Sequence, residues 1–240
     1  MEVRFLCAGD TAIVVEFGDG IDRALSDRVL RLGAKVRAQE VPGVIETVPT
    51  YRSLMVHYDP LQTDNASLQS TLESLLEDDA ISAANARLWS IPACYEATHA
   101  PDLDDVAMRT GLTPEQVVQM HADTLFHVYM IGFVPGYPYM GDLPDALVLP
   151  RRADPRIRVP PGSIAIASTM TAIYPIESPG GWHLIGTTPI RLFDASLVRP
   201  ALFAPGDKVR FEPISAARFD EVKQASAAGT YTVTYESIAS

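Results

Sequence analysis

The pattern of apolar and polar positions predicts a small α/β unit in the first 90 residues. A β-branched run at 11–17 ends in Gly-Asp-Gly, which indicates a strand followed by a turn. Two later segments carry apolar residues at three- and four-residue spacings with charges between them, as amphipathic helices do. The predicted order is a strand at 11–17, a helix at 21–36, strands at 44–48 and 51–58, a helix at 65–77 and a strand at 87–91. This βαββαβ order is typical of a ferredoxin-like sandwich.

The rest of the chain predicts two short helices and then many short strands. Asp102 and Asp104 suit the start of a helix that ends at Gly111. Thr113-Pro-Glu-Gln is a capping-box variant, which starts a second helix reaching about Ala122. Apolar strands separated by Gly and Pro follow at 126–133, 163–167, 171–175, 183–185, 190–193, 208–213 and 231–235. Such a pattern favours a closed β-barrel with the helices at its rim.

The expected fold class is therefore α+β, with two domains. Residues 1–90 would form the ferredoxin-like sandwich, and residues 91–240 the β-barrel with two short helices. A chain of 240 residues is long enough to give each domain its own core.

One stretch, 132–194, is unusually dense in proline and glycine. Proline fixes φ and glycine admits positive φ, so such loops have a closely specified backbone. Aromatic and cationic side chains alternate through the same stretch, which indicates an apolar, positively charged wall of a binding groove. The side chains concerned are Phe133, Tyr137, Tyr139, Tyr174, Trp182, Arg151, Arg152, Arg156 and Arg158.

Composition and charge narrow the function classes. The net charge of −11 argues against a nucleic-acid partner, which would need a basic face. Apolar runs are too short for a membrane helix, and the N-terminus lacks a signal-peptide core, so a cytoplasmic protein is expected. Cys7 and Cys94 are too few for a disulfide scaffold and are expected as core thiols.

The common catalytic signatures are absent from the sequence. It contains no phosphate-binding GxxxxGK[ST] loop, no GxGxxG after a strand, no HExxH and no GxSxG. Histidines and cysteines lack metal-ligand spacing, so no metal site is expected, and the chain has no biotin-attachment signal. ATP, if used, would not be held by a P-loop.

Several longer strings resemble one known family, called allophanate hydrolase subunit 1. The family includes the B subunit of the bacterial ATP-dependent 5-oxoprolinase, the sporulation-kinase inhibitors, and subdomains C and D of the carboxyltransferase domain of urea carboxylase. The strings that carry the resemblance are Gly-Phe-Val-Pro-Gly-Tyr-Pro-Tyr-Met-Gly (132–141), Pro-Arg-Arg (150–152), Arg-Val-Pro-Pro-Gly-Ser (158–163), Ile-Tyr-Pro (173–175) and Ser-Pro-Gly-Gly-Trp-His-Leu-Ile-Gly (178–186).

The resemblance implies a cyclophilin-like β-barrel and an enzyme that works as a heteromer. Its companions would be a C subunit, from the allophanate hydrolase subunit 2 family, and a separate A subunit. Together they would hydrolyse 5-oxo-L-proline to L-glutamate with ATP, so that this chain alone would be inactive. The lactam amide is a poor electrophile, and phosphorylation of its oxygen by ATP would supply a leaving group.

The candidate site residues follow partly from residue chemistry and partly from the resemblance. Arginines hold phosphates and carboxylates through paired donors, which favours three of them as anion ligands. His121 corresponds to a histidine of the family that it resembles. It would either act as a general base or hold the end of the barrel closed through hydrogen bonds. His127 and His183 are expected to be exposed or packed strand residues. The expected substrate- or nucleotide-binding residues are Arg151, Arg152, Arg158, Thr171, Tyr174 and Glu177.

The chain departs from the family in one place. Where the family has Gly-Gly-Gln-Thr-Gly before Ile-Tyr-Pro, this chain has Ser168-Thr-Met-Thr-Ala. The change removes an amide side chain at Met170 and a permissive glycine at Ala172, which alters hydrogen bonding and the allowed backbone angles.

Two further functions stay open from the sequence. In the first, the chain is a non-catalytic binding protein that inhibits a sensor histidine kinase through its barrel groove. Alternatively, a carboxyltransferase-type subunit would act on urea- or allophanate-like amides with a biotinyl partner. The arginine cluster favours the amide hydrolase, because it suits anionic ligands.

Overall fold

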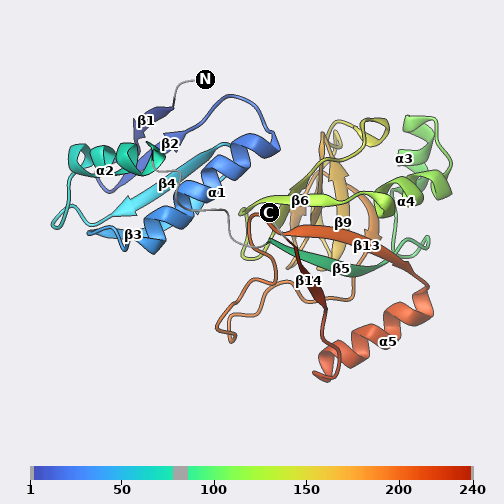
Figure 1. Ribbon diagram of the computed structural model, residues 1–240. Coiled ribbons are helices and arrows are strands. Elements are labelled where there is room, and N and C mark those ends of the chain that lie inside the picture. Colours follow the sequence, from blue (N-terminus) through green and yellow to red (C-terminus); the bar gives the residue numbers. More distant parts are fainter. Residues whose placement is uncertain (1–2, 78–85, 239–240) are drawn as a thin grey trace. The chain divides into compact units, whose positions relative to one another are not determined.

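The computed structural model describes residues 3–77 and 86–238, and its internal contacts divide the chain into two units. The first unit ends at Ala86, and the second runs from Arg87 to Ile238 (Figure 1). The predicted α+β class, with a small N-terminal sheet followed by a closed barrel, is confirmed.

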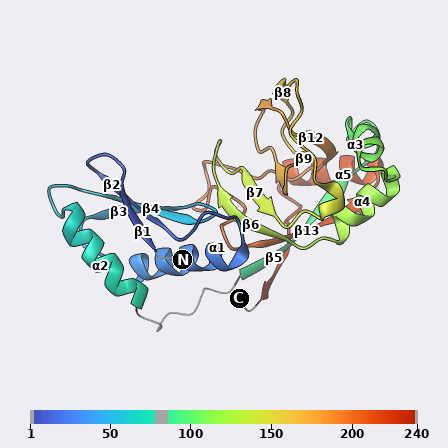
Figure 2. The same ribbon diagram turned by 90° about the horizontal axis from the view of Figure 1, so that it is seen from above.

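The first unit is a four-stranded antiparallel sheet with two helices on one face (Figure 2). The strand order is β1-β2-β4-β3, and both helices contribute to a single apolar core with β2 and β4. α1 begins where the Asp22 side chain accepts a hydrogen bond from the Leu25 amide, at 2.9 Å. The elements are β1 (Arg4–Cys7), β2 (Ala12–Glu16), α1 (Arg23–Ala38), β3 (Val44–Pro49), β4 (Ser53–Tyr58) and α2 (Asn65–Glu77).

One strand of the predicted sandwich belongs elsewhere. The segment expected to complete the N-terminal sheet, 87–91, does form a strand, β5 (Ala86–Cys94), but it pairs in parallel with β13 (Lys208–Ile214) in the barrel. The edge of the N-terminal sheet is instead occupied by β1, which pairs with β2. The expected boundary at residue 90 therefore moves to Ala86, because β5 is buried in the barrel rather than in the sandwich.

The second unit is a seven-stranded closed barrel. Its strands follow the order β12-β9-β10-β7-β6-β13-β5, and β5 closes the ring by pairing with β12 through Cys94 and Thr187. β14 adds to β5 outside the ring, and a separate two-stranded ribbon joins β8 and β11. The remaining strands are β6 (Phe126–Ile131), β7 (Pro138–Gly141), β8 (Arg156–Val159), β9 (Ser163–Ala167), β10 (Met170–Ile173), β11 (Ser178–Gly180), β12 (His183–Thr187) and β14 (Tyr235–Ile238).

Helices cover the barrel, as expected for the first two. α3 (Leu103–Thr110) and α4 (Pro114–Asp123) place Val106 and Val117 in the barrel core (Figure 1). α3 ends at Gly111 in the left-handed conformation, and α4 begins with the complete capping box of Thr113 and Gln116. A 3-10 turn, η1 (Asp145–Leu147), and a further helix, α5 (Ala216–Ala227), complete the unit.

Three sequence expectations differ from the structure here. α5 has no counterpart among the expected helices, although Phe219 and Val222 are buried one turn apart on it. The strand expected at 190–193 is reduced to an isolated bridge between Phe193 and Ala201. The last strand begins at Tyr235 rather than at 231. No helix within the described ranges is both long and apolar enough to cross a membrane.

Candidate functional site

Four aromatic side chains of the 132–194 stretch gather with one arginine, and we call this set the aromatic–arginine patch: Tyr137, Tyr139, Tyr174, Trp182 and Arg151. The Tyr137 ring centroid lies 4.9 Å from that of Tyr139 and 5.1 Å from that of Tyr174. The Trp182 ring lies 6.1 Å from Tyr139, and the Arg151 guanidinium carbon lies 6.0 Å from the Trp182 ring. The aromatic wall expected from the sequence therefore exists as one cluster.

The patch lies on the outer wall of the barrel. Successive side chains of a strand point to opposite faces. Met140 of β7 belongs to the interior core, so Tyr139 beside it faces outward. Gly180 of β11 allows the ribbon to approach, because a Cβ there would lie 2.1 Å from the Tyr174 hydroxyl oxygen.

Two phenols of the patch, those of Tyr139 and Tyr174, stay protonated at neutral pH. Burial raises the pKa of Tyr139, opposed by the nearby Arg151. Burial also raises the pKa of Tyr174, against a hydrogen bond with the Tyr137 side chain and the charges of Arg151 and Arg156. Protonated phenols beside a guanidinium are hydrogen-bond donors, so the patch can stabilise an anion or a carbonyl oxygen but supplies no base.

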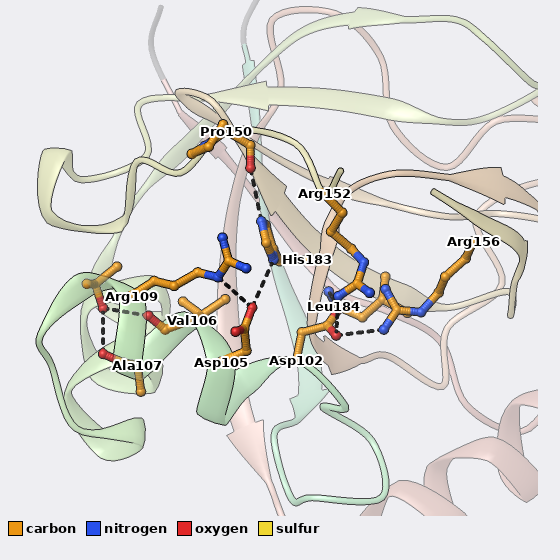
Figure 3. A network of polar contacts seen from close by, with 11 residues as sticks. Asp102, Asp105, Val106, Ala107, Arg109, Pro150, Arg152, Arg156, His183 and Leu184 are labelled. Carbon is orange, nitrogen blue, oxygen red and sulfur yellow. Dashed lines mark hydrogen bonds and ion pairs between the residues drawn. The ribbon is translucent and has the colours of Figure 1, made fainter. Parts of the chain in front are cut away.

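A carboxylate beside the patch holds two more arginines of the predicted wall (Figure 3). Asp102 Oδ1 accepts from Arg152 Nη1 at 3.0 Å and from Arg156 Nη2 at 2.6 Å, and its Oδ2 accepts from the Leu184 amide at 2.7 Å. The Asp102 side chain is 5% exposed. We call the side chains of Asp102, Arg152 and Arg156 the Asp102 latch, because they tie the start of α3 to β12 and to the 151–156 loop.

The Asp102 latch keeps surplus positive charge. Two guanidinium groups share one carboxylate, and Arg152 Nε and Arg156 Nη1 are buried without a hydrogen-bond partner among the described residues. Buried donors without partners are uncommon, since each costs desolvation free energy. The latch therefore keeps two buried donors without partners and a net positive charge.

A second polar chain lies beside the latch (Figure 3). His183 Nε2 donates to the Pro150 carbonyl at 3.0 Å, while its Nδ1 is 3.9 Å from Asp105 Oδ2. Asp105 also pairs with Arg109 at 2.8 Å. His183 is 1% exposed, so it is a packed strand residue, one of the two environments expected for it.

The other predicted pair lies on the ribbon. Arg158 of β8 and Glu177, just before β11, are 3.7 Å apart, and their side chains are 79% and 56% exposed. In Figure 2 the loops around β8 extend away from the barrel strands. Both residues are accessible to a ligand or partner, but their mutual ion pair is weak because water screens it.

His121 and Thr171 lie inside the barrel instead of in a groove. His121 Nδ1 is 2.9 Å from the Tyr95 hydroxyl, and its Nε2 is 2.9 Å from Thr171 Oγ1. Thr171 donates its hydroxyl hydrogen to the Ala165 carbonyl, so His121 Nε2 is the donor to Thr171 and Nδ1 accepts from Tyr95. Burial lowers the pKa of His121 to about 3.

This geometry separates the predicted site residues into two groups. The expectation that Thr171 and Tyr174 face a groove is wrong, because both side chains are buried. Thr171 is a partner of His121, and Gly180 of the ribbon lies over the Tyr174 hydroxyl. For His121, full burial with both ring nitrogens bonded favours a cap of the barrel over a general base. Arg151, Tyr174 and the latch arginine Arg152 lie together, with Arg158 and Glu177 on the adjoining ribbon.

Asp102 is a site residue that the sequence pattern does not reveal. The pattern indicates only a helix start there, and the Asp102 side chain in fact makes no cap hydrogen bond. An acidic residue at a helix start that does not cap has a free carboxylate for another cation, and the fold decides which cation that is.

The remaining candidate ligands and nucleophiles are the His, Cys, Asp and Glu side chains. Among residues 3–77 and 86–238, no group of three or more His, Cys, Asp or Glu side chains could hold a metal ion. Cys94 is a buried thiol, whereas the expectation of a core thiol at Cys7 is wrong, because β1 is an edge strand and Cys7 is exposed on it.

Comparison with known proteins identifies the family. The model of the carboxyltransferase domain, subdomain C and D, matches residues 3–203. The chain belongs to this family. The membership confirms the resemblance carried by the proline- and glycine-rich strings.

Two bacterial relatives match over nearly their full length. The 5-oxoprolinase B subunit of Bacillus subtilis (strain 168) is 35% identical over 232 residues, which cover 91% of this chain and 95% of the relative. The 5-oxoprolinase B subunit of Escherichia coli O157:H7 is 38% identical over 210 residues, covering 88% of this chain and 95% of the relative.

Solved structures share the fold of this chain. The crystal structure of TTHA0988 is 35% identical with a TM-score of 0.76, and the match covers 90% of this chain but spans only 41% of that longer chain. The Kluyveromyces lactis urea carboxylase has a TM-score of 0.77 at 21% identity, covering 98% of this chain and 24% of that chain, and at this identity it shows the fold alone.

Proposed function

We propose that this chain is the B subunit of an ATP-dependent 5-oxoprolinase, an amide hydrolase that converts 5-oxo-L-proline to L-glutamate. The observation that carries the proposal is the near full-length similarity to two proteins that bear the name of this 5-oxoprolinase component, at 35% and 38% identity. Similarity of this extent covers both units, including the aromatic–arginine patch and the Asp102 latch.

The chemistry of the patch fits a step in which negative charge develops on a lactam. Transfer of the ATP γ-phosphoryl group to the lactam oxygen leaves ADP, and water then opens the activated ring with release of phosphate. Arg151 and the protonated phenol of the half-buried Tyr139 supply donors for an anionic group, and the positive charge of the latch arginines lies nearby. None of these groups is a base, so the base that activates water would be another group, such as the exposed Glu177 carboxylate or a residue of a companion subunit.

The proposal therefore includes partners. Companion C and A subunits would complete the site, and ATP would be shared among them, because this chain has no P-loop. Supporting this division, the accessible residues of the candidate site, Arg158 and Glu177, are exposed on a ribbon where a second chain can reach them.

Reconstitution of the complex tests the proposal. The chain is co-expressed with the companion A and C subunits, the complex is purified, and ATP-dependent release of glutamate from 5-oxo-L-proline is measured. We expect glutamate from the complete complex, and none from this chain alone or from the A and C subunits without it. A verified complex that releases no glutamate would show that the substrate is a different one.

A charge variant tests the patch itself. In the complex, Arg151→Gln is expected to lower kcat/KM for 5-oxo-L-proline about tenfold or more, as loss of a charge-assisted hydrogen bond does. Arg199→Gln removes the same charge from an exposed loop position and should leave the rate unchanged. Equal rates for Arg151→Gln and the wild type would remove Arg151 from the site.

A further inference from the structure

A pocket of about 480 Å³ lies on a part of the barrel wall that the proposed function does not use. Residues of β9, β12 and α5 line it, together with the 98–101, 160–162 and 188–191 segments. Its volume lies in the range of small-molecule sites. α5 begins after residue 203, where the family match ends, so Phe219 and Lys223 come from a part of the chain that the family model does not cover.

The charge of this pocket is opposite to that of the protein. Its lining contains Arg191 and Lys223 and no aspartate or glutamate, although the chain carries 30 acidic residues and a net charge of −11. Arg191 is neutralised by Asp194, at 2.8 Å. Lys223 forms no ion pair within the described part of the chain, and its ammonium lies 5.9 Å from the Phe219 ring. One uncompensated positive charge therefore belongs to the pocket.

A hydroxyl that lines the pocket adds a second polar group. Ser163 lines the pocket and is only 4% exposed. Its neighbour Ile164 belongs to the interior core, so the Ser163 side chain faces outward from the barrel, toward the pocket. Its hydroxyl makes no hydrogen bond to any described residue, and the hydroxyl oxygen is not fully sealed from solvent. The hydroxyl is therefore available to a ligand.

The remaining walls are apolar and stiff. Five prolines line the pocket, and proline fixes the backbone φ angle, so the walls are formed before a ligand arrives. Leu184 of β12 and the Phe219 ring add apolar surface, and Phe219 is held by the His99 ring at 4.4 Å. A ligand that fills this space needs a compact hydrocarbon body.

We infer that this pocket binds a small carboxylate with a compact apolar body. The carboxylate charge pairs with the Lys223 ammonium, and a carboxylate oxygen accepts a hydrogen bond from the Ser163 hydroxyl. The inference goes beyond the proposed function, because the pocket is formed by this chain alone and needs neither ATP nor a companion subunit.

Titration calorimetry on the full chain tests the inference with three probes. Cyclopentanecarboxylate carries both features, cyclopentanecarboxamide keeps the ring without the charge, and inorganic phosphate has charge without an apolar body. We expect the carboxylate to bind, and the amide and phosphate to bind at least about tenfold more weakly, since one charge-assisted hydrogen bond or a buried ring is worth about that factor.

Matched variants locate the binding. Lys223→Gln and Arg218→Gln each remove one positive charge from α5, but Arg218 pairs with Glu221 and does not line the pocket. Lys223→Gln should weaken cyclopentanecarboxylate binding about tenfold, and Arg218→Gln should leave it within about twofold. Ser163→Ala should weaken binding severalfold without destabilising the fold, because its hydroxyl has no partner to lose.

Three results would each overturn the inference. In the first, cyclopentanecarboxylate does not bind. In the second, the amide or phosphate binds as tightly as cyclopentanecarboxylate. In the third, the Lys223→Gln variant binds cyclopentanecarboxylate as tightly as the wild type does. None of them bears on glutamate release by the complete complex, so the two proposals fail separately.

Discussion

At the scale of single residues, the turn between β9 and β10 places a serine where the backbone favours glycine. Ser168 has φ +52°, and the pairing of Ala167 with Met170 leaves only Ser168 and Thr169 in the turn. An L-residue in this region costs about 1 kcal/mol relative to glycine. Four positions depart from the family string, and among them only Ser168 has a positive φ, so only there does the backbone itself favour the family's glycine.

Glycine at this turn should stabilise the barrel. Ser168→Gly is expected to raise the free energy of unfolding by about 0.5–1 kcal/mol, because it removes the left-handed strain. Both tryptophans, Trp89 and Trp182, belong to the barrel unit, so urea unfolding followed by tryptophan fluorescence reports on it. Thr169→Gly is the control and should give no gain, since Thr169 has no positive φ. A gain at Thr169 alone would contradict the explanation.

The second residue-scale prediction concerns the buried His121. Its pKa is lowered to about 3 by burial, against 6.5 for an exposed histidine. Between these values the unfolded chain binds a proton that the folded chain does not, so the barrel loses stability as the pH falls below about 6.5, by at most about 1.4 kcal/mol per pH unit.

Substitution isolates this contribution from the other titrating groups. The His121→Gln variant has no imidazole to protonate, so only the wild type loses stability through this group as the pH falls. The difference in free energy of unfolding between the wild type and the variant should therefore become smaller from pH 7 to pH 5. Tryptophan-detected urea unfolding at several pH values measures it. His57→Gln, in the N-terminal sheet, should leave the pH dependence of the barrel transition as in the wild type. A constant difference for His121→Gln would mean that His121 takes up its proton over the same pH range in the folded chain as in the unfolded chain.

At the scale of elements, the Asp102 latch joins α3, β12 and the 151–156 loop through one carboxylate. Asp102→Asn keeps the shape but removes the charge that compensates Arg152 and Arg156. We expect a loss of about 2–4 kcal/mol, below the cost of breaking a fully buried pair because both arginines are partly exposed. Asp105→Asn, three residues along, breaks the surface pair with Arg109 and should cost under about 0.5 kcal/mol. Equal losses in tryptophan-detected unfolding would show that the latch adds nothing beyond a surface pair.

The elements also show how far local patterns reach. The capping box of α4 and the left-handed end of α3 depend on neighbouring residues, and both are predicted from the sequence. The partner of β5 depends on a segment near the other end of the chain, where Lys208 lies opposite Leu88, and no local pattern encodes that choice. The candidate site divides in the same way. The aromatic patch is predicted because all of its residues fall in the one stretch, 132–194, that is dense in proline and glycine. Asp102 lies outside that stretch, and its contacts with Arg152 and Arg156 follow only from the fold.

At the scale of the whole molecule, the chain has two separate apolar cores. The core of the first unit is built from α1, α2 and the N-terminal sheet, and that of the second from the barrel strands with α3 and α4. A unit with its own core can unfold by itself. We therefore expect a core substitution in one unit to lower the stability of that unit alone.

Leu54 provides the test, because it is fully buried in the first core. Leu54→Ala should destabilise the first unit by about 2–5 kcal/mol through the cavity it leaves. Hydrogen exchange read by mass spectrometry should then show faster exchange in β2 and β4 but unchanged protection in β9 and β12. Ile166→Val, a smaller change in the barrel core, should destabilise the second unit by about 0.5–1.5 kcal/mol. Exchange should then be faster in β9 and β12, with unchanged protection in β2 and β4. Simultaneous loss of protection in both units of Leu54→Ala would mean that the chain unfolds as a single cooperative body, and the two cores would then be one folding unit.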